Sequence, residues 1–513
     1  MIDLFEIYKY ETLISSLPGG RMVSNFYFSN EIIEKVSEQI QEAEKSIRIA
    51  IFQIHHLGIL DSLNEKLKEG VSVELFTLPL DSIHDEGVKK KISKKLDEFK
   101  ENGGQLHFCG WNVGDPGRTT TAVGRWYSFH GKIIVTEKCA IALSANLFET
   151  PELDAAIVIK ENEEIINDFN LKIDLLKELF TIPNNEYQGN IREKIEEYDE
   201  DENIFKLPDN IDDKYRKLWI NHYPIEKCPE EVGTLEGLYI TPFNCRGREF
   251  FMDIIHEAEE YVYISSESFT DVAFANFLIK LAIEKDIEIR ILCGISSMDF
   301  TDRVNKLLRE LLSQNIKIRT SDNDLHAKIC ITEKHLVVSS INLNKINLGF
   351  HPKNKYWREN TETIYVSQNA KLIEEAQEKF NEVYGNCTDV KEKLAEKLRN
   401  TAKHIFSTNY GLTSTTEAKN IFAKRILDSQ IDIIKETHEI GRYVHMVSEK
   451  LHKKRVDKDL INSALILHSL SKCDMTLREL ENEISSDNLE PLLQELLQSG
   501  LVSEENGYYK LNL

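Results

Sequence analysis

The sequence predicts an α/β protein made of two similar lobes, followed by a helical segment and a small C-terminal domain. Three observations indicate this fold class. One polar motif occurs twice with identical spacing, helical and strand patterns alternate upstream of both copies, and beyond residue 385 the pattern becomes helical. Because such alternation is typical of strands joined by helices, we expect a mainly parallel sheet covered by helices in each lobe.

The duplicated motif contains a histidine, a lysine two residues later, a glutamate five residues after the lysine, and a Ser-x-Asn element that ends nine residues after the glutamate. The two copies are His130, Lys132, Glu137, Ser144 and Asn146, and His326, Lys328, Glu333, Ser340 and Asn342. A single His-x-Lys pair occurs often by chance, usually on a solvent-exposed strand. The repeat of the full pattern indicates one site built from two halves.

The β-branched residues that follow each lysine predict a strand. Since alternate residues of a strand point to the same face, the histidine and lysine of each copy lie side by side. A turn at Thr-Glu-Lys and a second apolar run, residues 140–143 or 336–338, then form a hairpin. Its far end presents the serine and asparagine on one face, so four polar groups converge in each half.

The same order of elements precedes both motifs. In each half an amphipathic helix leads into a strand, and a helical stretch and another strand follow. The helices are expected at residues 32–46 and 250–258, and the strands at 47–51 with 71–75 and at 261–264 with 287–292.

These side chains suit phosphodiester chemistry without a metal ion or other cofactor. A neutral imidazole can attack phosphorus, and a second, protonated imidazole can donate a proton to the leaving oxygen. Lysine ammonium and asparagine amide groups can hold the non-bridging oxygens. Two histidines must be in opposite protonation states at one pH, which explains why two copies are needed.

The doubled motif resembles the signature of the phospholipase D superfamily, His-x-Lys-x4-Asp followed by Gly-Ser-x-Asn. The resemblance covers about residues 25–385. It implies that the halves form a pseudo-dimer with one shared site, a phosphohistidine intermediate and no metal. The sequence departs from the signature because Glu137 and Glu333 replace the aspartate, and the family's glycine is absent before Ser144 and is Ser339 before Ser340. We expect these changes to be structural adjustments, since the acid lies at the strand end, away from the reacting atoms.

The resemblance also implies a carboxylate after each motif, which accepts a hydrogen bond from the far nitrogen of the histidine. Glu362 in the second half and Asp154 in the first are the matching residues. The alternative is that either one is an exposed acid at the end of a strand.

The C-terminal part contains helical patterns and one hairpin. Ser414 and Glu417 form a capping-box pattern, and apolar residues from Phe422 to Leu451 predict one long helix with a single apolar stripe, which packs on the body or pairs with another subunit. Residues 457–513 predict a winged-helix-like domain whose third helix carries acids and no basic residue. Because an acidic helix is repelled by phosphates, we expect protein interactions there more than DNA binding.

The predicted domain organisation follows from these patterns and from an acidic run between the lobes. The predicted parts are a first phospholipase D-like lobe (1–185), an acidic linker or insertion (186–234), a second lobe (235–385), a helical segment (386–456) and the winged-helix-like domain (457–513).

Composition sets further limits. The chain has 513 residues and a net charge of −23, with no apolar run long enough to span a bilayer and no signal-peptide pattern. We therefore expect a cytoplasmic protein that does not bind membranes. Eight scattered cysteines form no cluster with zinc-site spacing.

The net charge opposes nucleic-acid binding, but the sequence around the motifs is locally basic. We expect a substrate groove that combines cations with an aromatic side chain able to stack on bases. The candidate substrate-binding residues are Arg118, Arg125, Trp126, Lys353, Lys355 and Arg358.

Three classes of function fit these patterns. The favoured class is a metal-independent nuclease, with DNA preferred to RNA, since the family includes bacterial restriction and antiviral defence nucleases. A homo-oligomer or a companion protein bound through the C-terminal region is also expected. The alternative enzyme is a phospholipase D or cardiolipin synthase-like transferase, and the third class is a non-catalytic scaffold.

Overall fold

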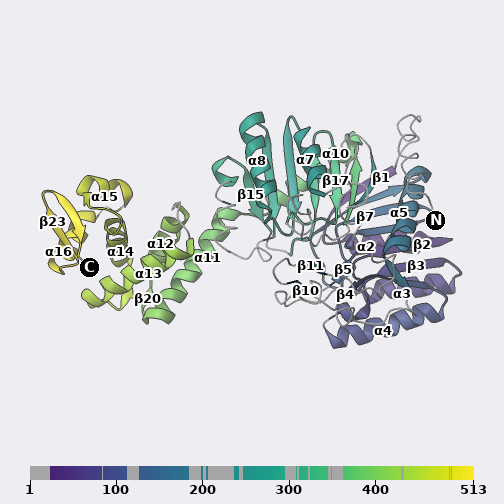
Figure 1. Ribbon diagram of the computed structural model, residues 1–513, viewed down its shortest axis with the longest axis horizontal. Coiled ribbons are helices and arrows are strands. Elements are labelled where there is room, and N and C mark those ends of the chain that lie inside the picture. The colour runs from purple at the N-terminus through teal and green to yellow at the C-terminus, as the bar shows by residue number, and fades with distance from the viewer. Residues whose placement is uncertain are drawn as a thin grey trace. The chain divides into compact units, whose positions relative to one another are not determined.

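The computed structural model describes residues 23–83, 85–112, 126–183, 198–199, 204–205, 236–241, 247–294, 308, 311–321, 324–344, 348, 362–428, 433–484, 486 and 488–512. The chain forms two compact units (Figure 1). One contains residues 1–299 and 310–387 and holds both copies of the motif, and the other contains residues 300–309 and 388–513.

The first lobe contains a nine-stranded sheet in the order β1-β8-β7-β6-β2-β3-β4-β5, with β9 paired to β4. Its strands are β1 (Val23–Ser29), β2 (Ser46–Ile51), β3 (Ser72–Thr77), β4 (Gln105–Asn112), β5 (Trp126–Ser128), β6 (Lys132–Thr136), β7 (Cys139–Leu143), β8 (Asp154–Lys160) and β9 (Thr181–Pro183). Its helices are α2 (Ile32–Glu42), α3 (Leu57–Lys68), η2 (Leu80–Ser82), α4 (Glu86–Glu101) and α5 (Glu163–Phe180). Two short strands, β10 (Tyr198–Asp199) and β11 (Ile204–Phe205), pair within the predicted linker.

The second lobe repeats this strand order as β12-β18-β17-β16-β13-β14-β15. Its strands are β12 (Gly237–Thr241), β13 (Tyr261–Ser266), β14 (Glu288–Cys293), β15 (Lys317–Thr320), β16 (Ile329–Thr332), β17 (Leu336–Ser339) and β18 (Glu362–Ser367). Its helices are α7 (Gly247–His256), α8 (Val272–Lys285) and α10 (Ala370–Gly385). Asp85, Asp271 and Asn369 cap α4, α8 and α10 by accepting backbone N–H bonds, so side-chain capping helps to set where these helices begin.

The prediction of a mainly parallel sheet is wrong, because both sheets are mixed. Parallel pairing is confined to β2-β3-β4 and its counterpart β13-β14-β15. The strands that carry the motifs pair antiparallel with their neighbours. A two- or three-residue turn joins the strands of each motif hairpin, and a connection so short can join only antiparallel strands.

Both predicted motif hairpins are confirmed. β6 pairs with β7 and β16 with β17, and all described residues of these strands are buried. The glutamate that replaces the family's aspartate has a structural role in each. Glu137 accepts the backbone N–H groups of Glu44 (2.7 Å) and Ser46 (3.1 Å), and Glu333 accepts that of Glu259 (2.8 Å). Each glutamate thus fastens its hairpin turn to the preceding helix-strand connection, as expected.

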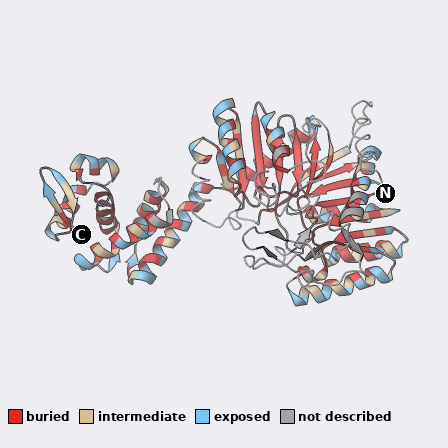
Figure 2. Cartoon of the chain, viewed as in Figure 1, coloured by how far each residue is buried: buried red, intermediate tan, exposed pale blue. Residues whose placement is uncertain are grey.

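The two lobes share one hydrophobic core. Phe129, Ile133 and Leu153 of the first lobe belong to the same buried cluster as Ala327 and Tyr365 of the second. A separate cluster lies between the first sheet and helices α2, α3 and α4. Figure 2 shows the strands of both sheets as largely buried. The shared core fixes one lobe against the other and so brings their motif hairpins together.

The helical segment differs from the predicted single long helix. Within the second unit, α12 (Thr416–Asp428) and α13 (Ile433–Lys450) are separate helices. The residues just before α12, β20 (Thr413–Ser414), pair in parallel with those just after α13, β21 (Arg455–Val456). A continuous helix would hold its two ends about 50 Å apart at 1.5 Å per residue, so the chain must reverse between them.

The apolar stripe on these helices packs inside the second unit itself. Phe422, Ile426, Ile440, Val444 and Val447 are buried in its own core. The expected packing on the body or pairing with another subunit is therefore replaced by packing within the unit. The helix start also lies one residue later than expected, because Thr415 Oγ1 accepts the backbone N–H of Ala418 (3.1 Å).

The last part of the chain has the element order helix, strand, helix, helix, strand, strand. Asn506 (φ 54°) and Gly507 (φ 80°) form the hairpin turn, and left-handed backbone at both positions is what a type I′ turn requires. None of the described helices has the length and apolar content that a membrane crossing requires. The remaining elements of this unit are β19 (Thr388–Asp389), α11 (Val390–His404), η6 (Ile405–Asn409), α14 (Lys458–Leu470), β22 (Met475–Thr476), α15 (Leu477–Glu483), α16 (Leu489–Gln498), β23 (Val502–Glu505) and β24 (Tyr508–Leu511).

Candidate active site

The first histidine and lysine lie at the start of β6. Lys132 is fully buried, and its Nζ donates to the carbonyl of His130 (2.7 Å) and lies 3.5 Å from His130 Nε2. The residue between them must be glycine, because a Cβ on Gly131 would approach the Phe129 ring to 2.3 Å and Thr363 Cγ2 to 2.5 Å. The close packing at Gly131 therefore holds His130 against the second lobe.

The second copy has the same local geometry at the start of β16. Lys328 is buried, and its Nζ donates to the carbonyl of His326. The side chains of Asn146 and Asn342 follow β7 and β17 and are almost fully or partly buried, and the Oδ1 atom of each is buried with no hydrogen-bond partner among the described residues. The two side-chain amides therefore lie at the ends of the motif hairpins, with their Oδ1 atoms buried.

Each histidine is paired with a carboxylate from the other lobe. His130 Nδ1 lies 2.8 Å from Glu362 Oε2, and His326 Nδ1 lies 3.0 Å from Asp154 Oδ1. The motif serines hold these carboxylates from within their own lobes, since Ser144 Oγ donates to Asp154 Oδ1 (2.8 Å) and Ser340 Oγ donates to Glu362. Neither half-site is complete without the opposite lobe.

Backbone N–H groups also form hydrogen bonds between the two lobes beside these carboxylates. The N–H groups of His326 and Ala327 both donate to the carbonyl of Leu153, at 3.0 and 2.9 Å. In the other direction the N–H of Lys132 donates to Thr363 Oγ1 at 3.1 Å. Leu153, just before Asp154, and Thr363, just after Glu362, thus each bond to the motif of the opposite lobe. These bonds restrict how the two histidines can face each other.

Burial determines the charge state of the first half. Burial, assisted by the nearby Lys132, lowers the pKa of His130 to about 4, although Glu362 acts in the opposite direction. Burial and the second lysine, Lys328, lower the pKa of Lys132 to about 7. His130 is therefore neutral at pH 7, and if Nδ1–H donates to Glu362, its Nε2 carries a free lone pair.

The two partner carboxylates remain ionised. Burial alone would raise their pKa values, but the histidine, a lysine and the serine hydrogen bond together outweigh it. The pKa values of Asp154 and Glu362 are therefore both lowered. Each carboxylate can therefore accept from its histidine and fix the ring orientation.

A further carboxylate, Glu267, enters the site, and sequence reasoning missed it. It follows β13, and its Oε2 lies 3.6 Å from His326 Nε2, 3.5 Å from Lys328 Nζ and 3.1 Å from Asn342 Nδ2. Burial raises its pKa, but Lys328 and then His326 lower the pKa to about 2. The repeated motif does not extend to this position, and the role of Glu267 becomes visible only from its distances to His326 and Lys328.

The group Glu152, Asp154 and His326 could supply ligands to a metal ion, and within the described residues it is the single such group. Glu152 Oε2 lies 3.7 Å from His326 Nδ1, and burial raises the pKa of Glu152. Nδ1 of His326 and Oδ1 of Asp154 already bond to each other. A metal ion held by those atoms would have to break the bond that orients His326.

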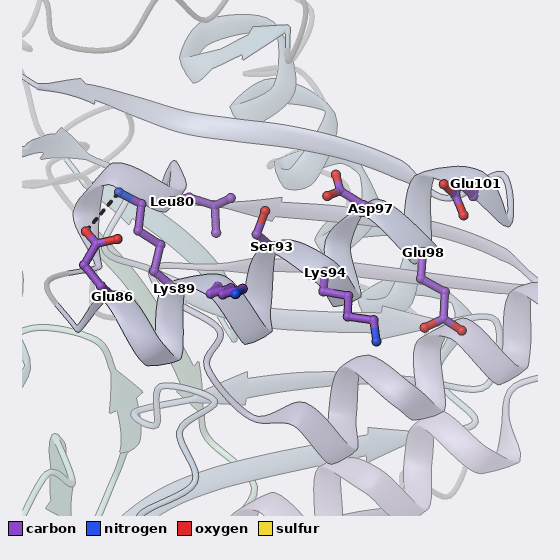
Figure 3. A pocket seen from close by; sticks show the side chains of 9 residues that line it. Leu80, Glu86, Lys89, Ser93, Lys94, Asp97, Glu98 and Glu101 are labelled. Atoms are coloured by element: carbon purple, nitrogen blue, oxygen red, sulfur yellow. Dashed lines mark ion pairs between the residues drawn. The ribbon is translucent and has the colours of Figure 1, made fainter.

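The expected substrate-binding residues Arg118, Arg125, Lys353, Lys355 and Arg358 lie outside the described residues. Trp126 is the first residue of β5, where its backbone pairs with Asn112. A surface depression of about 890 Å³ lies along α4 instead (Figure 3). Lys89, Lys90 and Lys94 line this depression together with acidic side chains, and no motif residue does. It is therefore not part of the site that holds the histidines.

Comparison with known proteins agrees with this geometry. The family model described as "Cardiolipin synthase, PLD-like domain" matches residues 251–384, which include the second motif and Glu362. The second lobe thus matches a phospholipase D-like domain family over residues 251–384. No curated protein matches the chain.

Three solved structures that are similar to this chain have low sequence identity to it. The phosphatidylserine synthase of Haemophilus influenzae is 14% identical, with a TM-score of 0.48, covering 72% of this chain and 87% of that chain. A polyphosphate kinase from Porphyromonas gingivalis is 12% identical (TM-score 0.40; 73% and 52% covered). Nuc, a phospholipase D family member from Salmonella typhimurium, is 18% identical (TM-score 0.26; 30% and 97% covered).

Proposed function

We propose that this protein is a nuclease of the phospholipase D superfamily that cleaves phosphodiester bonds through a phosphohistidine intermediate and without a metal ion. DNA is the favoured substrate, and a role in bacterial restriction or antiviral defence fits such an activity. The observation that carries the proposal is the crossed pairing of His130 with Glu362 and of His326 with Asp154. This pairing orients two imidazoles that differ in their surroundings.

In the first step, Nε2 of His130 attacks phosphorus and the bond from phosphorus to the leaving oxygen breaks. His326 donates its Nε2 proton to that oxygen. In the second step, water attacks phosphorus, the phosphorus–nitrogen bond to His130 breaks, and His326 takes up the proton of the water. The lysines and asparagines of both motifs bind the non-bridging oxygens.

The low pKa of His130, about 4, supports its assignment as the nucleophile, since its lone pair is available at neutral pH. His326 has a carboxylate within 3.6 Å of each ring nitrogen, Asp154 at Nδ1 and Glu267 at Nε2. A doubly protonated ring at this position would have an acceptor for each N–H, which suits the acid of the first step.

Lysines on α4 favour nucleic acid as the substrate. Five lysines lie between residues 89 and 95, and Lys90, Lys91 and Lys94 are exposed and form no ion pair with any described residue. The segment that leads into α4 begins close to His130. The backbone N–H of Leu78 donates to the carbonyl of Phe52, and the Phe52 ring contacts His130. These cations can bind backbone phosphates on the approach to the site.

The alternative is a phospholipid-processing enzyme, either a phospholipase D or a cardiolipin synthase-like transferase. The description of the matching family model favours it, because that description names cardiolipin synthase. The same two chemical steps apply, with an alcohol replacing water in a transferase.

The C-terminal unit supports a role in partner binding. Its last elements follow the order of a winged helix, and we assign α16 as the helix that would enter a DNA groove. That helix carries Glu490 and Glu495 and no Lys or Arg, and Glu495 pairs with Lys453 (3.2 Å). An acidic α16 favours a companion protein or a second copy of the chain over DNA at this surface.

The test uses the purified full chain with labelled DNA, RNA and phospholipid vesicles in the presence of EDTA. We expect cleavage of DNA, with loss of activity by several orders of magnitude in both His130→Ala and His326→Ala, because the two residues act as a unit. Because a phosphorus–nitrogen bond to histidine hydrolyses in acid but survives in alkali, an alkaline quench followed by mass spectrometry should find the phosphoryl group on His130. Cleavage of vesicle lipid alone would establish the alternative, and a label trapped on His326 would reverse the histidine roles.

A further inference from the structure

The two halves of the site differ at one pair of equivalent positions, Phe52 and Glu267. Each is the first residue after the central strand of its lobe, β2 or β13. Two residues later, Ile54 forms a β-bridge with Leu147, and the counterpart of this bridge joins Phe269 to Leu343. Leu147 and Leu343 directly follow the two motif asparagines. The repeat therefore places a phenylalanine in one half where it places a glutamate in the other.

Phe52 forms an apolar wall in the first half. Its ring centroid lies 4.5 Å from that of His130 in an edge-on arrangement, and Lys132 Nζ lies 5.7 Å from the same centroid. Phe52 is 4% exposed, so it helps to exclude water from His130. This packing contributes to the burial that keeps His130 neutral.

Glu267 makes the opposite kind of contact in the second half. Its Oε2 faces His326 Nε2, Lys328 Nζ and Asn342 Nδ2, all within 3.6 Å. These are the three groups that the proposed mechanism uses to bind a phosphate and protonate its leaving oxygen. A carboxylate oxygen that accepts from Asn342 and lies within ion-pair distance of the other two groups occupies the position that a phosphate oxygen needs, and two anions cannot share it.

The side chain of Glu267 has access to solvent in this position. It is 34% exposed, whereas Lys328 beside it is fully buried. A rotation of the glutamate toward solvent would leave the lysine, the asparagine and the histidine in place for a ligand.

We propose that Glu267 is an intramolecular anion that occupies the phosphate subsite of the second half and is displaced by substrate. The displacement opposes the binding of every anion by the same amount. Free phosphate and small monoesters, which have few other contacts, should therefore bind too weakly to occupy the subsite, whereas an extended phosphodiester can still bind through its remaining contacts. The identity of that diester rests on the proposed function, but occupation of the subsite does not.

The test measures binding of inorganic phosphate to the full-length protein by calorimetry at pH 8. Glu267→Gln keeps the size and removes the charge, so it should bind phosphate about tenfold more tightly than wild type. The matched control is Glu152→Gln, because Glu152 also lies near His326 but contacts Nδ1, the ring nitrogen opposite the one that Glu267 faces. Its phosphate affinity should stay within about twofold of wild type, since only occupation of the subsite is expected to matter.

Equal tightening in both variants would show an effect of net charge and would overturn the proposal, as would no tightening in Glu267→Gln. If Glu267→Gln fails to fold, judged by its circular dichroism and melting, Glu267→Asp provides the second variant, since its shorter side chain should retract from the subsite and tighten phosphate binding. Phosphate should also inhibit substrate cleavage more strongly in either Glu267 variant. The calorimetric result does not depend on which diester is cleaved, so it separates this proposal from the nuclease assignment.

Discussion

Glu362 Oε2 lies 2.8 Å from Nδ1 of His130, although 232 residues and a change of lobe separate them. Glu362 is fully buried, so its charge has little access to water. The pairing joins the motif of one lobe to the carboxylate strand of the other, and the contact of Asp154 with His326 repeats it in the opposite direction. The lobes are therefore linked through the groups that we assign to catalysis.

This relationship predicts a specific coupling in stability. His130→Ala leaves the buried carboxylate of Glu362 without its partner and should lower the free energy of unfolding of the two-lobed unit by about 3 kcal/mol. Addition of Glu362→Gln removes the unpaired charge and should recover part of that loss, whereas Asp154→Asn should add its own loss. Urea unfolding of the three single variants and the two double variants, compared with wild type, measures the two couplings. A coupling of His130 with Asp154 as large as that with Glu362 would contradict the crossed arrangement.

The neutral state of His130 predicts an unusual pH dependence. Its pKa in the folded protein is about 4, against an ordinary value of 6.5. The folded state thus binds fewer protons than the unfolded state between these values, so stability should be complete above pH 6.5 and fall as the pH drops toward 4. The acid limb of kcat/KM should lie near pH 4, and activity should decline above about pH 7, where Lys132 loses its charge.

Phe52→Ala provides the control for this profile. It admits water to the His130 ring, so the acid limb should move up toward 6.5. An acid limb already near 6.5 in the wild-type enzyme would mean that burial does not set the state of the nucleophile.

The local elements of the site were predictable, and its long-range contacts were not. The hairpins after His130 and His326 follow from β-branched runs and short turns, which are properties of adjacent residues. The choice of Glu362 as partner of His130 depends on how two lobes dock through a shared core, which no local pattern encodes. Glu267 was missed for a related reason, because its role is visible only when its distance to Lys328 is known.

The single-helix prediction failed where the sequence gives no stop signal. Residues 428–432 read Asp-Ser-Gln-Ile-Asp, without glycine or proline, and the apolar spacing continues across them from Phe422 to Val447. The stripe keeps its period because both helices face the same core of the second unit. No local pattern separates the two helices, and it is their packing within the second unit that distinguishes them.

The proposed mechanism predicts how activity responds to chelation and to added metal ions. Imidazole, ammonium and amide groups fill every proposed catalytic role, so activity should persist in EDTA. Added Zn²⁺ should inhibit, since binding to Asp154 and His326 would break the bond between them. Turnover of the chelated enzyme with and without added Zn²⁺ checks both statements. Full loss of activity in EDTA that metal restores would contradict the mechanism.

The lysines of α4 give a test of the substrate class. Reversal of charge at Lys90, Lys91 and Lys94 should raise KM for DNA about tenfold at low salt and reduce the salt dependence of binding. Cleavage of a small chromogenic diester should not change, because these residues lie away from the histidines. Lys100→Glu is the matched control on the same helix, since Lys100 is already paired with Asp97 (2.8 Å). An unchanged KM for DNA in the triple variant would show that the nucleic acid does not follow α4.

The separate cores of the two units predict that the C-terminal unit can be removed without loss of the site. Every proposed catalytic residue belongs to residues 1–387, and the core of the second unit is formed by residues 398–502 alone. A fragment that ends at Cys387 should therefore fold, with its site intact, and should cleave a small diester at a rate close to that of the full chain. Partner binding, oligomeric state or preference among long substrates should change, since the C-terminal unit is lost. The measurement requires a soluble fragment whose folding is confirmed by circular dichroism and cooperative melting. If such a fragment is inactive on every substrate, even at high concentration and low salt, then the C-terminal unit contributes directly to the active site and the division of labour is wrong.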